Sequence, residues 1–342
     1  MDERRPPTWA EWNAAADDDA RLTLLVRCAV LAPSGHNTQP WLFRVRAGAL
    51  EVRADRTRAL PVVDPDDREL EMSVGAAIAH LRIAAAHFRR RPAVQLLPDP
   101  DDPDLSARLR IDEPAEANDE ATRLYEVMAR RHTDRGPYVD GAVAEETLAA
   151  LERAARQEGA WLASATAGDV KAALADLVAE GDRLQMGDRR FRRELSAWIH
   201  PNRTQSRDGM PGYAFGIEND LVSEMGRLVV RLFDTGKGQA AKDRELAEHS
   251  PALIVIGTPE DTSEACLHAG QALAHVWLEA TARGLAMSFL NQPIELPELR
   301  PSVAETVGHD GFPQVLMRLG RPEGAREGRR TPRRPVDEVL LA

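Results

Sequence analysis

Residues Ala269–Ala280, AGQALAHVWLEA, decide the fold of this chain, because an earlier segment, Val74–Ala85, repeats them as VGAAIAHLRIAA. The two segments share one register without a gap. Five identical pairs are each 195 residues apart: Gly75 and Gly270, Ala77 and Ala272, Ala79 and Ala274, His80 and His275, and Ala85 and Ala280. Apolar residues at i, i+3, i+4 and i+7 predict that both segments are helices.

Both predicted helices are apolar or small almost all round, so each must be covered on more than one side. Their glycines and alanines would let another backbone approach closely, and the simplest partner for each helix is the other one. Two unrelated alanine-rich core helices are the alternative. The context favours a repeat, because each segment follows a strand-like run and precedes an extended apolar or turn-rich stretch. We therefore predict two similar halves that meet through buried central helices.

Length and composition describe an ordinary globular chain. Its 342 residues suggest about two domains, or one domain built twice, and 43% hydrophobic residues can supply a large core. No apolar run approaches the ~18 residues that a membrane helix needs, and residues 1–10 lack a signal-peptide segment. We therefore expect a cytoplasmic protein without membrane contacts. The net charge of −11 argues against nucleic-acid binding.

Metal and nucleotide motifs are absent from the sequence. Cys28 and Cys266, the two cysteines, lie in helical patterns without a metal-ligand spacing, so we expect neither a disulfide framework nor a metal site. Histidines seven residues apart on each repeated helix could share a face, but no carboxylate accompanies them there. Core or surface histidines are the simpler interpretation. Dinucleotide-binding, Walker, GxSxG and HExxH motifs do not occur.

The remaining pattern predicts helices alternating with short strands. Helices are expected at about 17–31, 64–91, 120–130, 144–157, 169–183, 189–199, 219–233, 238–249 and 261–284. Strands are expected at about 42–45, 50–54, 94–97, 105–111, 161–165, 252–256, 287–290 and 314–319. The acidic segment 112–120 is interpreted as a linker, so we divide the chain into halves at 1–118 and 119–342.

Two polar segments could bind a ligand. In APSGHNTQPW, residues 32–41, the Ser34 hydroxyl, the backbone N–H groups near Gly35, and the amides of Asn37 and Gln39 could hydrogen-bond a flat heterocycle. A plain turn that ends the preceding helix is the alternative.

The second polar segment is RRHTDR, in which Arg131, Thr133 and Arg135 alternate. In an extended chain all three would point to one side, where two guanidinium groups and a hydroxyl suit a phosphate dianion. A solvated charged loop is the alternative.

These segments resemble those of the nitroreductase superfamily of FMN-dependent oxidoreductases. APSGHNTQPWLF is similar to its PSSxNxQPW-type segment, and RRHTDRGPY is similar to its RxSxR phosphate-binding stretch. The layout of nearly the whole chain resembles the Acg-like branch, in which two nitroreductase-like halves are fused. The resemblance implies an α+β fold, an α/β sandwich in which tandem duplication gives an intramolecular pseudo-dimer. Mixed sheets flanked by helices would surround the central buried helices.

The resemblance also implies one complete FMN site shared by the halves, with a degenerate counterpart, because each motif is clear in only one half. No catalytic side chain is implied, because the flavin carries the chemistry. For Arg333 and Arg334, a solvated basic tail is the alternative interpretation. The cofactor-binding residues would be Pro33, Ser34, Gly35, Asn37 and Gln39 from the first segment; Arg131, Thr133 and Arg135 at the phosphate; Ser288, Phe289, Leu290 and Asn291 against the ring; and Arg333 and Arg334 as a C-terminal contact to the phosphate.

The function implied is hydride transfer from NAD(P)H through FMN to an electron-poor small molecule, such as a nitroaromatic or a quinone. A flavin-sequestering protein with little turnover is one alternative, since the aperiodic segment 200–216 could be a lid. Oxygen-dependent breakdown of the flavin is another. The fused halves imply a monomer or a weak homodimer.

Overall fold

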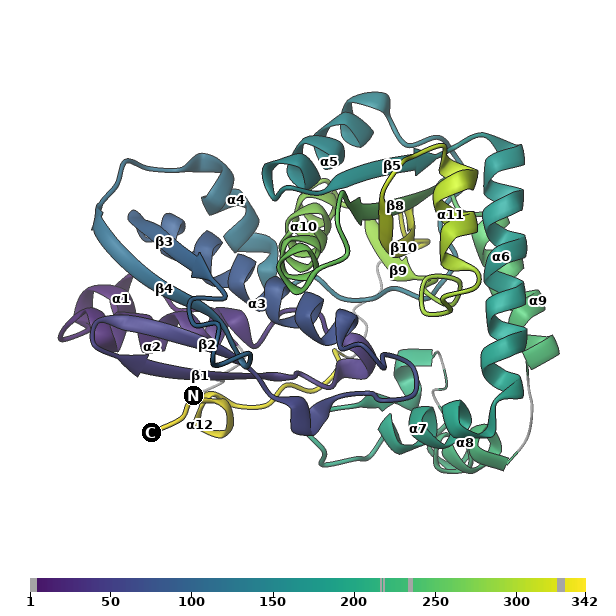
Figure 1. The fold of residues 1–342 in the computed structure, drawn as a ribbon, viewed down its shortest axis with the longest axis horizontal. Coiled ribbons are helices and arrows are strands. Elements are labelled where there is room, and N and C mark those ends of the chain that lie inside the picture. Colours follow the sequence, from purple (N-terminus) through teal and green to yellow (C-terminus); the bar gives the residue numbers. More distant parts are fainter. Residues whose placement is uncertain (1–4, 216, 218, 233–235, 325–329) are drawn as a thin grey trace.

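The computed structural model describes residues 5–215, 217, 219–232, 236–324 and 330–342. Two central helices lie between two four-stranded sheets, one on each side (Figure 1). The first sheet has the order β1-β2-β4-β3 and the second the order β5-β8-β10-β9. Their bounds are β1 (Trp41–Arg46), β2 (Ala49–Ala54), β3 (Arg90–Leu96) and β4 (Leu105–Pro114), then β5 (Trp161–Ala165), β8 (Ala252–Thr258), β9 (Ala286–Phe289) and β10 (Phe312–Gly320).

The expected mixed sheets are wrong, because all neighbouring strands in both four-stranded sheets are antiparallel. Among the described strands, β6 (Ile199–His200) and β7 (Met210–Pro211) pair in parallel, and isolated parallel bridges join Phe43 to Leu340 and Thr133 to Met287. Antiparallel neighbours can be joined by tight turns, whereas parallel neighbours need long crossovers. Between β1 and β2, Ala47 and Gly48 both have positive φ, 53° and 70°, as a two-residue hairpin turn requires.

The central helices are α3 (Arg68–His87) and α10 (Ser263–Ala282), and they pack against each other as predicted (Figure 1). A Cβ atom on Gly75 would lie 2.2 Å from the carbonyl oxygen of Leu267, and one on Gly270 would lie 1.9 Å from that of Met72. Met72 and Leu267 are themselves 195 residues apart. Equivalent positions therefore meet reciprocally, which is the contact pattern of an isologous interface. The duplication itself stays a prediction.

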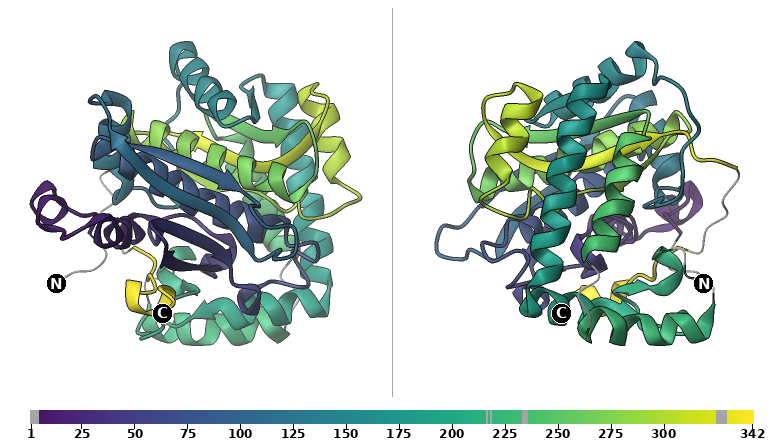
Figure 2. Two further views of the ribbon diagram at one scale, coloured as in Figure 1. Left: turned by 60° about the vertical axis from the view of Figure 1, so that its left-hand side comes forward. Right: turned by 90° about the vertical axis from the view of Figure 1, so that its right-hand side faces the viewer.

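Helices cover both faces of the second sheet. On one face, α5 (Glu145–Gln157) and α10 pack against Ile254 and Ile256 of β8. On the other face, α6 (Gly168–Gly187), α9 (Gly236–Glu248) and α11 (Arg300–Val307) pack against Leu253 and Val255. Successive side chains of a strand point to opposite faces, so the apolar run in β8 is buried on both sides. Figure 2 shows α6 and α9 along the outside of this half.

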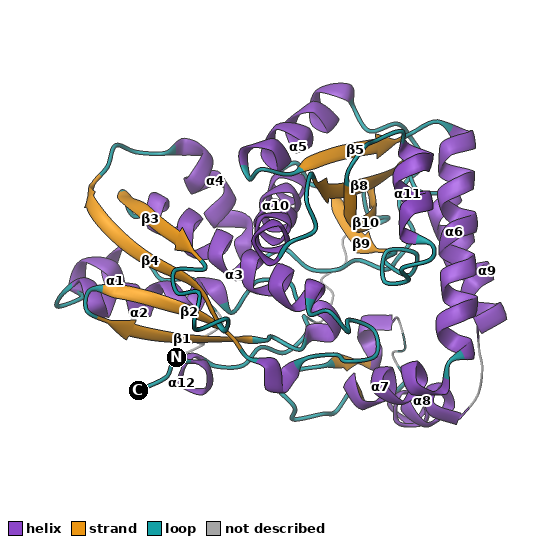
Figure 3. Cartoon of the chain, in the orientation of Figure 1, coloured by secondary structure: helices purple, strands orange, loops and turns teal. Residues whose placement is uncertain are grey.

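The first sheet packs on α2 (Asp18–Ala29), α3 and α4 (Asp119–Met128), with α1 (Trp9–Ala14) nearby. The proposed boundary at residue 118 stays a prediction. Two segments that follow residue 118 in the chain pack in the core of the first half. The helix α4 contributes Leu124 and Met128 to this core, and α12 (Val336–Val339) contributes Val339. Figure 3 shows the C-terminal segment and α12 beside β1.

The first central helix begins later than the expected residue 64. Asp67, at φ 55°, lies in the left-handed region, and the helix starts at Arg68. The Asp64 carboxylate still accepts the backbone N–H groups of Glu69 and Leu70, at 3.0 and 2.9 Å. Asp64 therefore satisfies the open N–H groups of the first turn from outside the helix.

The segment between β5 and β8 carries α6, α7 (Arg189–Trp198), α8 (Asp220–Leu232) and α9. Short 3₁₀ turns lie at η1 (Gly35–Asn37), η2 (Arg56–Arg58) and η3 (Gly212–Phe215). Residue 233 of the helix expected at 219–233, and residue 216 of the expected lid, lie outside the described residues. Within the described ranges, no helix combines the length and the apolar character needed to cross a membrane.

Candidate functional site

The turn at residues 33–41 has a strained backbone. His36, Asn37 and Gln39 have φ of 47°, 56° and 53°, in the left-handed region that few side chains favour. The Ser34 hydroxyl accepts the Gln39 N–H at 3.0 Å and so helps to hold this conformation. Strain of this kind persists where surrounding contacts fix it, and it concentrates at binding sites.

Gly35 joins this turn to the first central helix. Its N–H lies 3.4 Å from the Ser73 hydroxyl, and a Cβ atom at Gly35 would lie 3.2 Å from Oε2 of Glu69. A larger residue would therefore crowd the carboxylate. A small cavity opens at this junction and is lined by Gly35, Thr38, Arg58, Ala59, Leu60, Asp64, Glu69, Leu70 and Ser73.

The C-terminal segment binds the same turn through side-chain amides. Arg333 donates to Oδ1 of Asn37 at 2.8 Å, and the Asn37 amide donates to the Pro332 carbonyl at 3.1 Å. The Arg334 backbone N–H donates to Oε1 of Gln39 at 2.8 Å. Residues almost 300 positions apart in the chain thus form one side of the candidate site.

Arg131 reaches this place from the loop after α4. Its side chain is 6% exposed, and its Nη2 donates to the Leu31 carbonyl at 3.2 Å. Its guanidinium carbon lies 4.6 Å from the ring centroid of Trp277, in cation–π geometry. The two polar segments singled out in the sequence are therefore neighbours in the fold.

Arg131, Arg333 and His80 form what we term the cation cluster. Burial and the charge of Arg333 lower the pKa of Arg131 to about 9, and burial lowers the pKa of Arg333 to about 10. The Nε atoms of both arginines and Nε2 of His80 are buried and have no hydrogen-bond partner among the residues that the structure describes. Two buried guanidinium groups that repel each other are stabilised by an anion, and a phosphate group fits this pair.

Arg135 and Thr133 make different contacts from Arg131. The Arg135 guanidinium donates to the Ala214 carbonyl at 2.9 Å, and Thr133 forms a backbone bridge with Met287. The alternation in the sequence had suggested one common side for these residues and Arg131. Instead, the two arginines contact different segments, because the backbone pairing at Thr133 turns the chain toward β9.

The segment that ends β9 faces the same region. Ser288 and Leu290 are buried, and Asn291 is partly buried. The Phe289 ring contacts Trp277 edge-on, with 5.3 Å between centroids. This is the indole ring on which Arg131 stacks, so β9 is connected to the cation cluster by packing.

Two carboxyl groups lie between this segment and the strained turn. Asn291 donates to Oε1 of Glu69 at 3.0 Å, and Gln185 donates to Oε2 of Glu295 at 2.5 Å. Burial raises the pKa of both Glu69 and Glu295; the Asp64 carboxylate raises that of Glu69 further, and the Glu69 carboxylate raises that of Glu295 further. The pair therefore holds a proton more firmly than separate surface carboxylates would.

Residues 200–215, which we term the loop segment, cover the strained turn. The Asn37 amide donates to the Gly209 carbonyl, and the Gln39 amide donates to the Arg207 carbonyl, both at 2.8 Å. The predicted ligand-binding amides are therefore partly engaged by the loop segment in this conformation.

An ion pair anchors the loop segment. Asp208 pairs with Arg58, whose Nε donates to the Thr38 carbonyl at 2.5 Å. Hydrogen bonds from His200 and Ser206, together with the Arg58 charge, hold the pKa of Asp208 well below its usual range. The anchor stays ionised at neutral pH.

The position related to the cation cluster by the 195-residue offset is already neutralised. His275, the counterpart of His80, has Nδ1 3.0 Å from Oε1 of Glu158, whose other oxygen pairs with Arg82. Arg82 is the counterpart of Trp277. On this side a carboxylate of the protein already pairs with Arg82 and contacts His275, so the two positions differ in charge.

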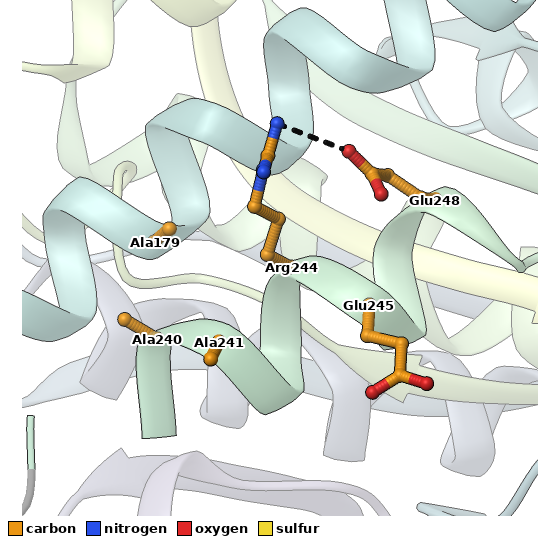
Figure 4. Close-up of a pocket in the computed structure, with 6 residues that line it drawn as sticks. All are labelled: Ala179, Ala240, Ala241, Arg244, Glu245 and Glu248. Carbon is orange, nitrogen blue, oxygen red and sulfur yellow. Dashed lines mark ion pairs between the residues drawn. The ribbon is translucent and has the colours of Figure 1, made fainter. Parts of the chain in front are cut away.

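A separate surface hollow lies between α6 and α9 (Figure 4), and none of the predicted site residues lines it. Arg244 and Glu248 form an ion pair across part of it at 3.2 Å. Among the described residues, no group of three or more His, Cys, Asp or Glu side chains could hold a metal ion. The hollow is lined by Ala179, Ala240, Ala241, Arg244, Glu245 and Glu248.

Sequence reasoning missed His80 and Trp277 as members of the site. His80 was interpreted as a core or surface histidine, and Trp277 is one of the residues of an apolar helix. A signal was present in the repeat, because Trp277 is matched by the charged Arg82 at the equivalent position. Because an aromatic residue in one copy of the repeat is matched by a charged residue in the other, the two equivalent positions are expected to differ in function.

The fold and this site define a class of protein. The family model described as the Nitroreductase family matches residues 128–321. The chain belongs to the nitroreductase family.

Individual relatives match nearly the whole chain. "Putative NAD(P)H nitroreductase Rv3131" of Mycobacterium tuberculosis is 32% identical, over 97% of this chain and 94% of the relative. "Putative NAD(P)H nitroreductase acg" of the same species is 29% identical, over 92% and 93%. Among solved structures, the FMN and NADPH-dependent nitroreductase NfnB from "sphigopyxis sp. strain HMH" is 18% identical, over 64% of this chain and 98% of that chain, with a TM-score of 0.42.

Proposed function

We propose that this protein is an FMN-dependent oxidoreductase that passes a hydride equivalent from NAD(P)H to an electron-poor small molecule, such as a nitroaromatic or a quinone. The observation that carries the proposal is the cation cluster beside the strained turn at residues 33–41. Membership of the nitroreductase family, with relatives named as NAD(P)H nitroreductases, supports the class of reaction.

Arg131 and Arg333 would hold the phosphate of FMN. The Nε–H group of each has no partner among the residues that the structure describes, and an arginine fork binds phosphate oxygens in pairs. Arg334 has a different role, because its side chain contacts the Gln39 carbonyl at 3.3 Å and Asp55 at 3.5 Å. It fixes the C-terminal segment on the turn and so places Arg333.

The turn and β9 would hold the rest of the cofactor. Ser34, Gly35 and Asn37 lie at the strained turn, and residues 288–291 would lie against the ring, although the Leu290 N–H is already donated to the Leu316 carbonyl at 2.9 Å. We place Arg135 toward the ring rather than the phosphate, because its guanidinium lies at the loop segment, where a positive charge would favour the reduced ring. A bound FMN supplies the two-electron transfer, so no side-chain nucleophile is required.

One FMN per chain follows from the charge difference between the two related positions. At the cation cluster an anion would relieve repulsion. At the related position, the Glu158 carboxylate lies 3.0 Å from the His275 ring and pairs with Arg82, so a phosphate there would meet a negative charge.

The test is direct. Purified protein is expected to bind one FMN per chain and, with FMN bound, to oxidise NAD(P)H in the presence of a nitroaromatic or a quinone. Riboflavin, which lacks the phosphate, should bind far more weakly. Protein that binds no FMN, or that does not oxidise NAD(P)H once loaded with FMN, would refute the proposal.

A second candidate function is flavin sequestration with little turnover. It is favoured by the loop segment, whose backbone engages the Asn37 and Gln39 amides. Stopped-flow mixing of the FMN-loaded protein with NAD(P)H separates the candidates. Rapid bleaching of the flavin absorbance supports the oxidoreductase, and reduction no faster than that of free FMN supports sequestration.

A further inference from the structure

His80 has one ring nitrogen in use and one without a partner. Its Nδ1 lies 3.0 Å from the Cys28 carbonyl oxygen, and because a carbonyl only accepts, Nδ1 carries the hydrogen and Nε2 keeps a lone pair. Nε2 is buried and has no partner within the described part of the chain. A buried polar atom left unpaired costs about 1–3 kcal/mol, so a ligand would account for its retention.

The backbone of α2 places His80 beside Arg131. The Cys28 carbonyl that contacts His80 and the Leu31 carbonyl that accepts from Arg131 lie in the same turn, because the Leu31 N–H donates to Cys28 at 3.1 Å. Burial, and then the charges of Arg131 and Arg333, lower the pKa of His80 to about 3. The imidazole of the free protein is therefore neutral at pH 7.

The other titratable groups around the His80 ring keep one protonation state near neutral pH. Burial raises the pKa of the Cys28 thiol to about 12, and the pKa of the neighbouring Tyr125 hydroxyl is also raised, so both stay protonated. Arg131 and Arg333 titrate well above pH 7. None of these groups is a carboxylate.

We propose that His80 is a third ligand of the bound phosphate: it takes up one proton when the anion binds and donates Nε2–H to a phosphate oxygen. The proposal rests on the proposed function, because the phosphate is that of FMN. A phosphate monoester has a second pKa of about 6 and is mostly a dianion at pH 7. Its two negative charges oppose the repulsion that keeps the imidazole neutral, and the proton converts a repulsive contact between two lone pairs into a charge-assisted hydrogen bond.

The consequence is a pH-dependent affinity. If binding takes up one proton, the association constant for FMN falls about tenfold for each unit of pH above 7, until the complex itself loses the proton. Riboflavin lacks the phosphate and should show no such dependence. The site would thereby combine recognition of a phosphate monoester with a response to pH.

Calorimetry counts the protons. FMN is titrated into flavin-free protein at pH 7.5 in two buffers of different ionisation enthalpy, HEPES and Tris. Wild type is expected to take up about one proton per FMN. His80→Gln keeps an N–H donor that does not titrate, so it should bind FMN with almost no proton uptake. His275→Gln, at the related position on α10, is the matched control and should behave like wild type.

The outcomes separate this proposal from the proposed function. Proton uptake that is absent in wild type, or equal in wild type and His80→Gln, overturns the role of His80 while FMN binding stands. Failure of wild type to bind FMN overturns both. If His80→Gln does not fold, ¹⁵N spectra of the wild-type histidines decide: conversion of Nε2 to the protonated form on adding FMN supports the proposal, and an unchanged neutral imidazole overturns it.

Discussion

Replacing Arg131 by methionine should weaken FMN binding without destabilising the flavin-free protein. Methionine can keep an apolar contact with the Trp277 ring, which lies 4.6 Å from the arginine, but it carries no charge. We expect the dissociation constant of FMN to rise and that of riboflavin to change little. The two effects isolate the phosphate contact from the ring contacts.

The magnitude in the complex follows from the lost contact. One charge-assisted hydrogen bond is worth about 1.5–3 kcal/mol, which corresponds to a loss of about ten- to a hundredfold in affinity. Arg333 and His80 would remain, so binding should weaken rather than disappear. The preference for FMN over riboflavin should shrink by the same factor.

In the flavin-free protein, the cost of burying the Arg131 charge is set against the contacts that its side chain makes. A pKa of Arg131 lowered to about 9 means that holding its charge costs a few kcal/mol, since a tenfold change in proton affinity is about 1.4 kcal/mol. The hydrogen bond to Leu31 and the contact with Trp277 offset about 1–3 kcal/mol of this cost. The free energy of unfolding of Arg131→Met should thus equal that of wild type or exceed it by up to about 2 kcal/mol.

The sign of the pH dependence follows. The folded-state pKa of Arg131 lies below its unfolded value, so the cost of the charge is constant below about pH 9 and declines as the pH rises further. Any advantage of the variant should therefore shrink above that pH. Urea unfolding of the flavin-free proteins at pH 7 and at higher pH measures this change.

Flavin fluorescence titrations with FMN and riboflavin measure the two affinities. Arg130→Met is the matched control, because Arg130 is the adjacent residue and its side chain is exposed. It should leave both dissociation constants unchanged. If Arg131→Met keeps the wild-type preference for FMN over riboflavin, Arg131 does not bind the phosphate and the reasoning fails.

Three further results are expected. Gly270→Ala places a Cβ atom 1.9 Å from the Met72 carbonyl oxygen and should lower the free energy of unfolding by about 3 kcal/mol or more. Gly168→Ala is the control, because its Cβ atom would meet no atom within 4 Å, and it should not lower the free energy of unfolding. Equal stabilities of the two variants in urea would contradict the packing of the central helices. Burial and a neighbouring carboxylate raise the pKa of Asp182 to about 8, so this acid makes the folded state less stable as the pH rises from about 4 to that value. Asp182→Asn should therefore gain up to a few kcal/mol over wild type across that range, and parallel melting-temperature curves against pH would show that the group is not buried as an acid. Asp208→Ala removes the anchor of the loop segment and should speed flavin reduction by NAD(P)H severalfold, measured at saturating FMN; an unchanged rate would show that the loop segment does not limit access.

The local sequence pattern was sufficient to predict helices and strands whose buried residues recur at regular intervals. The glycine and alanine spacing of the two central helices predicted their burial and their contact. The sequence also predicted a strand at residues 252–256, which the structure shows to be buried on both faces. These features follow from periodicity, because a helix or strand exposes its side chains at fixed intervals. The parallel or antiparallel sense of pairing has no such local signal, and there the expected mixed sheets were wrong.

Some residues of the candidate site were predicted from the sequence, and others were identified only in the tertiary structure. The sequence marked the turn at residues 33–41 and Arg131 as possible ligand-binding groups, and the family resemblance added Arg333 and Arg334. The tertiary structure alone separated Arg333 from Arg334, which are adjacent in the chain, because only Arg334 reaches Asp55. It also brought His80 beside Arg131 through two carbonyl groups at the end of α2. Charge and hydrogen-bonding capacity belong to each residue, but which charges remain unpaired depends on what the fold packs against them.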